Sequence, residues 1–194
     1  SVNDAPVVDL DANTGGPDFE TQFIENGAAK PVVDASINIS DVEGQDLQGA
    51  SIVLINGQPG DSLSVASLPL GIGAIVTPPG ALTAAGSVNV QLTGTADAAT
   101  YQTALQAISY SSNSDDPGSA DRTVFVTVSD GISNSVSATT TIEVQPVNDA
   151  PQADDDGIFT TDEDTPLVLS TGDLTANDSD PENDALTIVS VQDP

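Results

Sequence analysis

The chain has 194 residues and carries 30 aspartates and glutamates against one lysine and one arginine, a formal net charge of −28. It therefore lacks the basic surface that binding to nucleic acid or to an anionic membrane requires. Cys, His, Met and Trp are all absent, which excludes disulfides, thiol nucleophiles, imidazole bases and zinc sites. No apolar run approaches the roughly 20 residues that span a bilayer, so direct membrane insertion is not expected.

A five-residue string occurs twice in the sequence. Val2-Asn3-Asp4-Ala5-Pro6 recurs unchanged as Val147-Asn148-Asp149-Ala150-Pro151. Each copy ends in a proline, which forces the residue before it toward extended geometry, as in a linker. We interpret residues 1–147 as one domain, 148–151 as a linker and 152–194 as the first part of a second domain. The start at Ser1 is not typical of a signal peptide, so we expect an internal piece of a longer protein.

Apolar and polar residues alternate along much of the first domain. The alternation covers residues 33–40, 88–93, 124–128 and 136–144. A period of two predicts strands with one buried face and one face in water. Together with turns rich in Gly and Pro, this pattern predicts an all-β, Ig-like sandwich of two sheets.

One segment has helical rather than strand periodicity. Between Asp97 and Ile108 the apolar residues recur every three to four positions, and Asp97 is suited to cap the first turn. We predict one short helix there, crossing one end of the sandwich. Residues 111–121 are rich in Ser, Asn, Asp and Gly and are predicted to form a loop.

The remaining residues, 152–194, predict the beginning of another sandwich. Residues 167–169 and 186–191 are apolar enough to form strands, and a strongly acidic loop lies between them. The segment is too short to close a sandwich by itself. The second domain is therefore expected to be incomplete.

Acidic residues are concentrated where an Ig-type topology brings loops together at the ends of a domain. The candidate calcium ligands at the first end are Asn3, Asp4, Asp41, Glu43, Asp46 and Asp130. The candidates at the opposite end and in the second domain are Glu25, Asp121, Asn148, Asp149, Asp178, Asp180, Glu182 and Asp184. Calcium takes about six to eight oxygen ligands, and clustered carboxylates and carbonyls supply them. The alternative is a merely solvated acidic surface.

These features resemble the calcium plan of cadherins, in which a glutamate, an Asn-Asp linker and an acidic loop meet between successive domains. The resemblance is closer still to bacterial cadherin-like repeats of large RTX-type adhesins. It is carried by Leu92-Thr93-Gly94-Thr95, Ala120-Asp121-Arg122-Thr123, Val128-Ser129-Asp130-Gly131 and, in the tail, Asp162-Glu163-Asp164-Thr165-Pro166 and Leu174-Thr175-Ala176-Asn177-Asp178. It implies a tandem cadherin-like architecture, and it adds Glu163 to the candidate calcium ligands.

The resemblance implies a secreted, bacterial cell-surface spacer that calcium stiffens, in a biofilm adhesin exported by type I secretion. Its partners would be neighbouring domains of the same chain, and other domains would reach a glycan or cell-surface target. Alternatives are a module that itself binds a glycan or protein, and an accessory domain of a secreted enzyme. Paired carboxylates could serve a glycosidase. However, the scarcity of aromatic residues disfavours a sugar-binding surface, and we do not expect an enzyme.

Overall fold

The chain divides into two units, Ser1–Val147 (unit 1) and Asn148–Pro194 (unit 2), and each is described by itself. The structure is a computed structural model, and it describes residues 2–190. The boundary falls inside the second copy of the repeated string.

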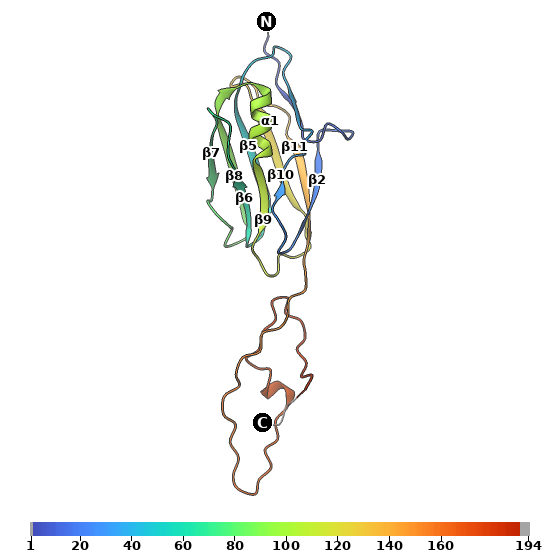
Figure 1. The fold of residues 1–194 in the computed structure, drawn as a ribbon, viewed down its shortest axis with the longest axis vertical. Helices are drawn as coiled ribbons and strands as arrows, with labels where there is room; N and C mark the ends of the chain where they lie inside the picture. Colours follow the sequence, from blue (N-terminus) through green and yellow to red (C-terminus); the bar gives the residue numbers. More distant parts are fainter. Residues whose placement is uncertain (1, 191–194) are drawn as a thin grey trace. The chain divides into compact units, whose positions relative to one another are not determined.

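Unit 1 is a sandwich with a six-stranded sheet on one side (Figure 1). Its elements are β1 (Val7–Asp9), β2 (Phe19–Ile24), β3 (Lys30–Pro31), β4 (Asn38–Ser40), β5 (Leu47–Gly57), β6 (Asp61–Val65), β7 (Gly73–Thr77), β8 (Gly86–Ala96), α1 (Ala98–Gln106), β9 (Ile108–Ser112), β10 (Arg122–Ser129) and β11 (Ala138–Gln145). The large sheet has the order β2-β11-β10-β5-β8-β7. The strands β3-β9-β6 form a second sheet, and β1 pairs with β4.

All strand pairs of unit 1 are antiparallel except one: β2 runs parallel to β11 at the edge of the large sheet. Their register joins Phe19 to Thr140 and Ile24 to Gln145. Both strands therefore end at the same end of the sandwich. The residues that follow them, the turn after Ile24 and the exit segment after Gln145, become neighbours for this reason.

The predicted alternation identifies the core correctly. Val88, Val90 and Leu92 of β8 are fully buried, as are Val124, Val126 and Val128 of β10. They pack with the buried residues of β5, a long central strand that pairs with both β8 and β10. The all-β class predicted from the sequence is confirmed.

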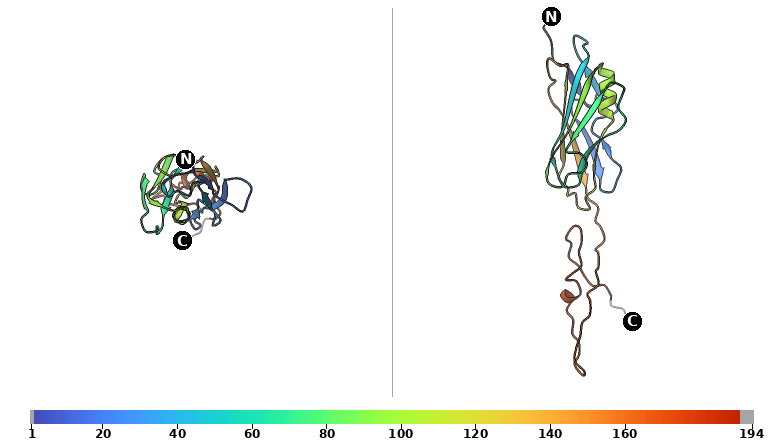
Figure 2. Two further views of the ribbon diagram at one scale, coloured as in Figure 1. Left: turned by 90° about the horizontal axis from the view of Figure 1, so that it is seen from above. Right: turned by 90° about the vertical axis from the view of Figure 1, so that its left-hand side faces the viewer.

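The predicted helix is also confirmed, as α1, but it lies along the side of the sandwich and does not cross one end, as predicted. The Asp97 carboxylate accepts a hydrogen bond from Thr100 N (2.8 Å), which caps the first turn. Tyr101, Ala104 and Leu105 form its buried face, and Figure 2 shows the helix along the outside of the sandwich. Within residues 2–190, no helix has the length and apolarity that crossing a bilayer demands.

Three predictions for unit 1 are wrong in detail. Residues 33–40 are not one strand, because the Asp34 carboxylate accepts from Ser36 N (2.8 Å) and starts a turn, leaving only Asn38–Ser40 to pair. The last strand begins at Ala138 rather than Val136, which is 89% exposed, because Ser135 N donates to Val128 O in the preceding hairpin loop. The predicted loop at 111–121 starts later, since β9 extends to Ser112.

Unit 2 contains a short 3-10 turn, η1 (Thr171–Asp173), and no strand within its described residues. The strands predicted at 167–169 and 186–190 are therefore wrong for the structure as described; residue 191 lies outside it. Val168 and Val189 are 85% and 94% exposed, and no side chain of the two segments is fully buried in the part of the chain that the structure describes. The order that unit 2 has comes from loops, including a bridge between Gln152 and Ser179.

A buried ion pair fastens the loop that precedes β10. Arg122 and Asp61 are both fully buried, and Arg122 Nε donates to Asp61 Oδ2 (2.5 Å). Arg122 also donates to the carbonyls of Pro117 and Ala120, and Tyr110 Oη donates to Asp61 Oδ1 (2.7 Å). Burial, and then the neighbouring Asp61, raise the pKa of Tyr110 well above its usual range, so its hydroxyl remains a donor.

We expect Arg122→Met to lower the free energy of unfolding by about 3–5 kcal/mol, because it leaves a buried carboxylate without its cation. Chemical denaturation in calcium-free buffer measures this. Lys30→Met is the matched control, since Lys30 is partly exposed and forms no salt bridge among the described residues. Equal losses in the two variants would mean that net charge, not the buried pair, sets the stability.

Candidate metal centre

At the end of unit 1 near the first copy of the repeated string, the side chain of Asn3 joins two loops. Asn3 Nδ2 donates to Asp130 Oδ2 (2.8 Å) and to Ser133 Oγ (3.2 Å), both in the hairpin between β10 and β11. Gln45 Nε2, from the loop between β4 and β5, donates to Asn3 Oδ1 (2.9 Å). The first copy of the repeated string is therefore bound to both loops.

The loop after β4 is wound around one carboxylate oxygen. Asp41 Oδ1 accepts from Glu43 N (3.0 Å) and Gln45 N (3.3 Å), and Gly44, at φ 65°, lets the chain close. Glu43 Oε2 in turn accepts from Asp4 N (3.3 Å). The other oxygen of Asp41, Oδ2, is buried and has no hydrogen-bond partner.

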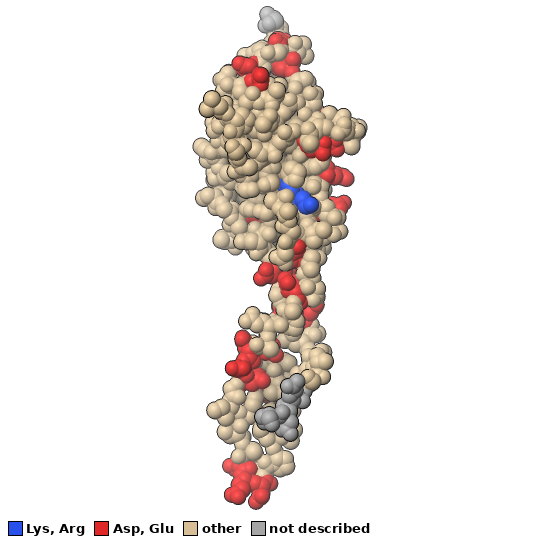
Figure 3. Space-filling view, viewed as in Figure 1, with Lys and Arg blue, Asp and Glu red and all other residues tan. Residues whose placement is uncertain are grey.

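Asp130 is 2% exposed and is held as an anion. Its Oδ1 accepts from Ile132 N and Ser133 N, each at 2.7 Å. Hydrogen bonds from Ser133 N, from Asn3 and from Ile132 N hold the pKa of its carboxyl below the usual range. Figure 3 shows acidic side chains gathered at this end of unit 1. The charged carboxylate of Asp130, the unpartnered Oδ2 of Asp41 and the amide oxygen of Asn3 thus lie in adjoining segments.

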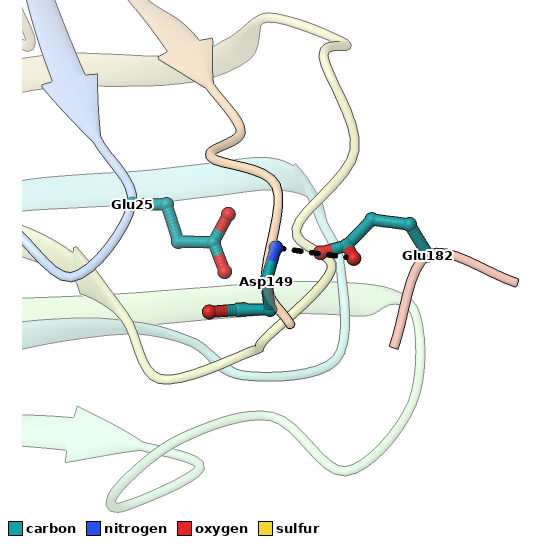
Figure 4. A group of neighbouring side chains, drawn as sticks. All are labelled: Glu25, Asp149 and Glu182. Atoms are coloured by element: carbon teal, nitrogen blue, oxygen red, sulfur yellow. Dashed lines mark hydrogen bonds between the residues drawn. The ribbon is translucent and has the colours of Figure 1, made fainter. Parts of the chain in front are cut away.

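The opposite end of unit 1 presents Glu25, in the turn after β2 (Figure 4). Because β2 and β11 end together, Glu25 Oε2 accepts from Val147 N (2.7 Å) on the exit segment. Glu25 is only 4% exposed, and its Oε1 has no hydrogen-bond partner. A buried carboxylate oxygen without a partner costs free energy unless a proton or a cation compensates it.

Unit 2 repeats the loop of Asp41 almost bond for bond. Asp180 Oδ1 accepts from Glu182 N (3.1 Å) and Asp184 N (3.0 Å), and Asn183, at φ 60°, stands where Gly44 does in unit 1. Glu182 Oε2 accepts from Asp149 N (3.3 Å), as Glu43 accepts from Asp4 N. The repeated string and the acidic loop therefore form the same pair of segments in both units.

Two carboxylates of unit 2 lie close together without compensation. Oxygens of Asp149 and Glu182 lie within 4.8 Å of each other, and Asp149 Oδ2 and Glu182 Oε1 are buried without a hydrogen-bond partner (Figure 4). Loss of hydration raises the pKa of Glu182, and the charges of Asp180 and Asp149 add to the rise. Both effects disfavour the charged form of the Glu182 carboxylate.

The other predicted ligands of unit 2 lie around the same segments. Asn148, Asp178, Asp180 and Asp184 line a hollow of about 530 Å³. Asp178 Oδ1 accepts from Asp154 N (2.9 Å), and its second oxygen remains available.

Three predicted ligands are not brought into these clusters. Asp46, Asp121 and Glu163 are exposed, and no hydrogen bond from the described residues holds their carboxylates. Asp121 contributes only its backbone carbonyl, which accepts from Asn56 Nδ2 (2.9 Å). Their ligand roles stay predictions.

Sequence reasoning missed Gln45 and Ser133. Gln45 could have been found by aligning the two acidic loops, because it occupies the position of Asp184. Ser133 carries no such signal, since only the hairpin fold brings it to Asn3.

The acidic loop between β1 and β2 was also overlooked. Asp11, Asp18 and Glu20 border a hollow of about 400 Å³ there. The Asp11 and Asp18 carboxylates accept from Ser36 Oγ and from Thr139 N, and no buried oxygen of this loop lacks a partner in the part of the chain described. We therefore assign no ion to it.

The donor set at the clusters suits a hard divalent cation. All the donors are carboxylate, amide or carbonyl oxygens, which are the ligands that calcium prefers. Arg122 is bound to Asp61, and Lys30, the only other base in the chain, forms no salt bridge among the described residues. The residues thus fit calcium at the loops of Asp41 and Asp180.

A family model described as "Cadherin-like domain" matches residues 147–194. Residues 147–194 are thus similar to a cadherin-like domain, and unit 1 is an all-β sandwich with one short helix. No curated protein matches the chain.

Among solved structures, "Crystal structure of human CDH23 EC21-23" is similar at 17% sequence identity and a TM-score of 0.33. The match covers 87% of this chain and 42% of that chain, so this chain spans less than half of the other. With so low a score, the likeness carries no argument.

We expect Asp130→Asn to lower the free energy of unfolding at neutral pH in calcium-free buffer. The depressed pKa of folded Asp130 stabilises the fold above the pKa of the unfolded chain, and this contribution is lost as pH falls through the folded value. The difference between wild type and variant should therefore shrink in acid, as denaturation at several pH values would show. Asp115 is an exposed acid with no hydrogen-bond partner in residues 2–190, so Asp115→Asn should leave the free energy of unfolding unchanged at neutral pH and in acid. A difference that persists unchanged in acid would contradict the assignment.

Proposed function

We propose that this chain is a calcium-stabilised spacer of an extracellular adhesin, and that it acts by stiffening the joints between tandem domains. Calcium binds at the Asp41 loop with Asn3, Asp4 and Asp130, and at the Asp180 loop with the second copy of the string. The role is structural, and no catalytic step is part of it. The neighbouring domains of the same protein are its partners.

One observation carries this proposal. The two acidic loops have the same hydrogen bonds, the same positive-φ position and the same link to a repeated Asn-Asp string. Both also keep buried carboxylate oxygens without partners. A solvated acidic surface would expose its oxygens to water instead. A repeated arrangement that desolvates them is what an ion site requires.

Glu25 is proposed to complete the site at the joint between the units. Its carboxylate accepts from Val147 N, and Asp149 follows two residues later along the chain. Because Asp149 lies only two positions after Val147 along the chain, we propose that Glu25 Oε1 and Asp149 Oδ2 bind the same ion. Asp178, Asp180, Glu182 and Asp184 are the further candidates from unit 2, and Asp121 from unit 1.

An extracellular setting is consistent with the chemistry. Extracellular calcium modules bind with dissociation constants of about 10⁻⁴ to 10⁻³ M, which suffices at the calcium levels outside cells. Before export the joints would lack the ion and remain flexible. The RTX-type, bacterial, type I secreted and biofilm assignments rest on the sequence resemblance described above and are part of the proposal.

We expect calcium to raise the melting temperature and EDTA to reverse the increase, because an ion that binds only the folded state stabilises it by mass action. Magnesium should substitute poorly, since it demands octahedral geometry and retains its waters. Asp41→Asn keeps an oxygen for Glu43 N and Gln45 N but removes a charge, and should weaken calcium binding at its site by about tenfold or more.

Calorimetric titration with calcium measures these affinities, with Asp115→Asn as the control that removes the same charge elsewhere. Asp180→Asn should weaken a different site from the one that Asp41→Asn weakens. A melting temperature that EDTA leaves unchanged would show that the acids are only a solvated surface.

We further expect calcium to narrow the distribution of dimensions of the chain in solution. Without the ion, facing carboxylates repel and the linker at 148–151 leaves unit 2 free to move. Small-angle scattering with calcium and with EDTA compares the two states. In both buffers the Asp149→Ala variant should have the broad distribution that wild type has in EDTA. Equally narrow distributions in both buffers would disprove stiffening, even if calcium still raised the melting temperature.

A further inference from the structure

The turn that positions Glu25 is built on an Asn-Gly pair. Gly27 N donates to Ile24 O (2.9 Å), and Asn26 takes a φ of 58° at the third position of the turn. Asn is one of the few residues other than Gly that adopt this conformation readily. A Cβ on Gly27 would lie 2.7 Å from Ile24 O, so only glycine fits there. The geometry of the turn therefore selects both residues.

We propose that Asn26 is a site of spontaneous deamidation. The reaction would irreversibly alter the turn that holds Glu25 against the exit segment of unit 1. The backbone nitrogen of Gly27 attacks Cγ of Asn26, a C–N bond forms, and the side-chain nitrogen leaves as ammonia with the proton from Gly27 N. Water then opens the cyclic imide at either carbonyl, giving aspartate or isoaspartate. Glycine favours the attack because it has no side chain to block the nitrogen.

The side chain of Asn26 is free to take the reactive rotamer. Asn26 is exposed, and no hydrogen bond to residues 2–190 holds its amide. The chain contains one other Asn-Gly pair, Asn56-Gly57, in a different setting. Asn56 Nδ2 donates to Asp121 O (2.9 Å) and its Oδ1 accepts from Thr123 N (2.8 Å), so that amide is fixed at both ends. Asn56 is a built-in control for Asn26.

The reaction at Asn26 requires the turn to open. Gly27 N cannot attack while its hydrogen is donated to Ile24 O, so the rate follows the open population of the turn. An ion bound to Glu25, which is the part of this inference that rests on the proposed function, would hold the turn closed. Free calcium at ten times its dissociation constant would lower that population by about tenfold.

The product would alter the joint through the backbone. Isoaspartate inserts one methylene into the main chain directly after Glu25, in a turn whose hydrogen bond spans Ile24 to Gly27. The Glu25 carboxylate would no longer reach Val147 N in the same geometry. Loss of calcium would thus lead from a reversible loosening of the joint to a permanent one.

The test incubates the full chain at neutral pH and physiological temperature, with calcium or with EDTA, and follows both Asn-Gly pairs by peptide mapping and enzymatic isoaspartate labelling. We expect conversion at residue 26 to exceed that at residue 56 by about tenfold, because the two amides differ in local opening. EDTA should accelerate residue 26 by about tenfold and leave residue 56 unchanged. Asn26→Gly keeps the turn conformation, contains no amide and should show no conversion there.

The outcomes separate the two claims. Conversion at residue 26 no faster than at residue 56 in EDTA would overturn the deamidation site, whatever calcium does. Selective conversion at residue 26 at the same rate in both buffers would support the deamidation site and count against calcium at Glu25. Asn26→Asp carries the same charge as isoaspartate but no extra methylene in the main chain. This variant should bind calcium better than wild-type protein that has formed isoaspartate during the incubation.

Discussion

The hydrogen bond from Val147 N to the Glu25 carboxylate depends on the parallel pairing of β2 with β11. Antiparallel pairing would send the two strands out at opposite ends of the sandwich and separate these residues. Parallel pairing instead places a glutamate against the segment through which the chain leaves unit 1. The carboxylate loses its water there and gains one donor, which leaves one oxygen to be satisfied by something outside the fold.

The acidic loops are local structures, and this explains how unit 2 contains one without any described strand. All the bonds that wind the Asp180 loop lie within five consecutive residues, as they do at Asp41. Their shape needs only an aspartate at the start and a residue that tolerates positive φ at the fourth position, Gly44 or Asn183. Ligand geometry can thus be set before the surrounding sheet forms. Only the attachment to the repeated string is longer in range.

Local periodicity predicted several core strands and the helix, but it missed a local turn, one alternating strand and the contacts that only the fold makes. The alternation at Val88 and Val124 identified core strands, and Asp97 identified the start of the helix. Residues 33–40 also alternate, but the Asp34 side chain bonds to Ser36 N, competes with strand pairing and turns the chain. β5 was overlooked, although Ala50, Ile52 and Leu54 alternate and are buried. At the candidate site, the acids were predictable from composition and repetition, but the contact of Asn3 with Asp130 and Ser133 follows only from the fold.

In the proposed function, the apolar core keeps unit 1 folded, and calcium adds to its stability while it stiffens the joints. The core of unit 1 is apolar, and its one buried arginine is matched by Asp61 inside the sandwich. Nothing in that core depends on a dissociable ion. The uncompensated oxygens lie instead at the two ends of unit 1 and in the loops of unit 2. In the proposed function, calcium therefore controls how units are joined while the sandwich remains folded. A chain with a net charge of −28 and no disulfide can then alternate between loose and stiff joints without unfolding.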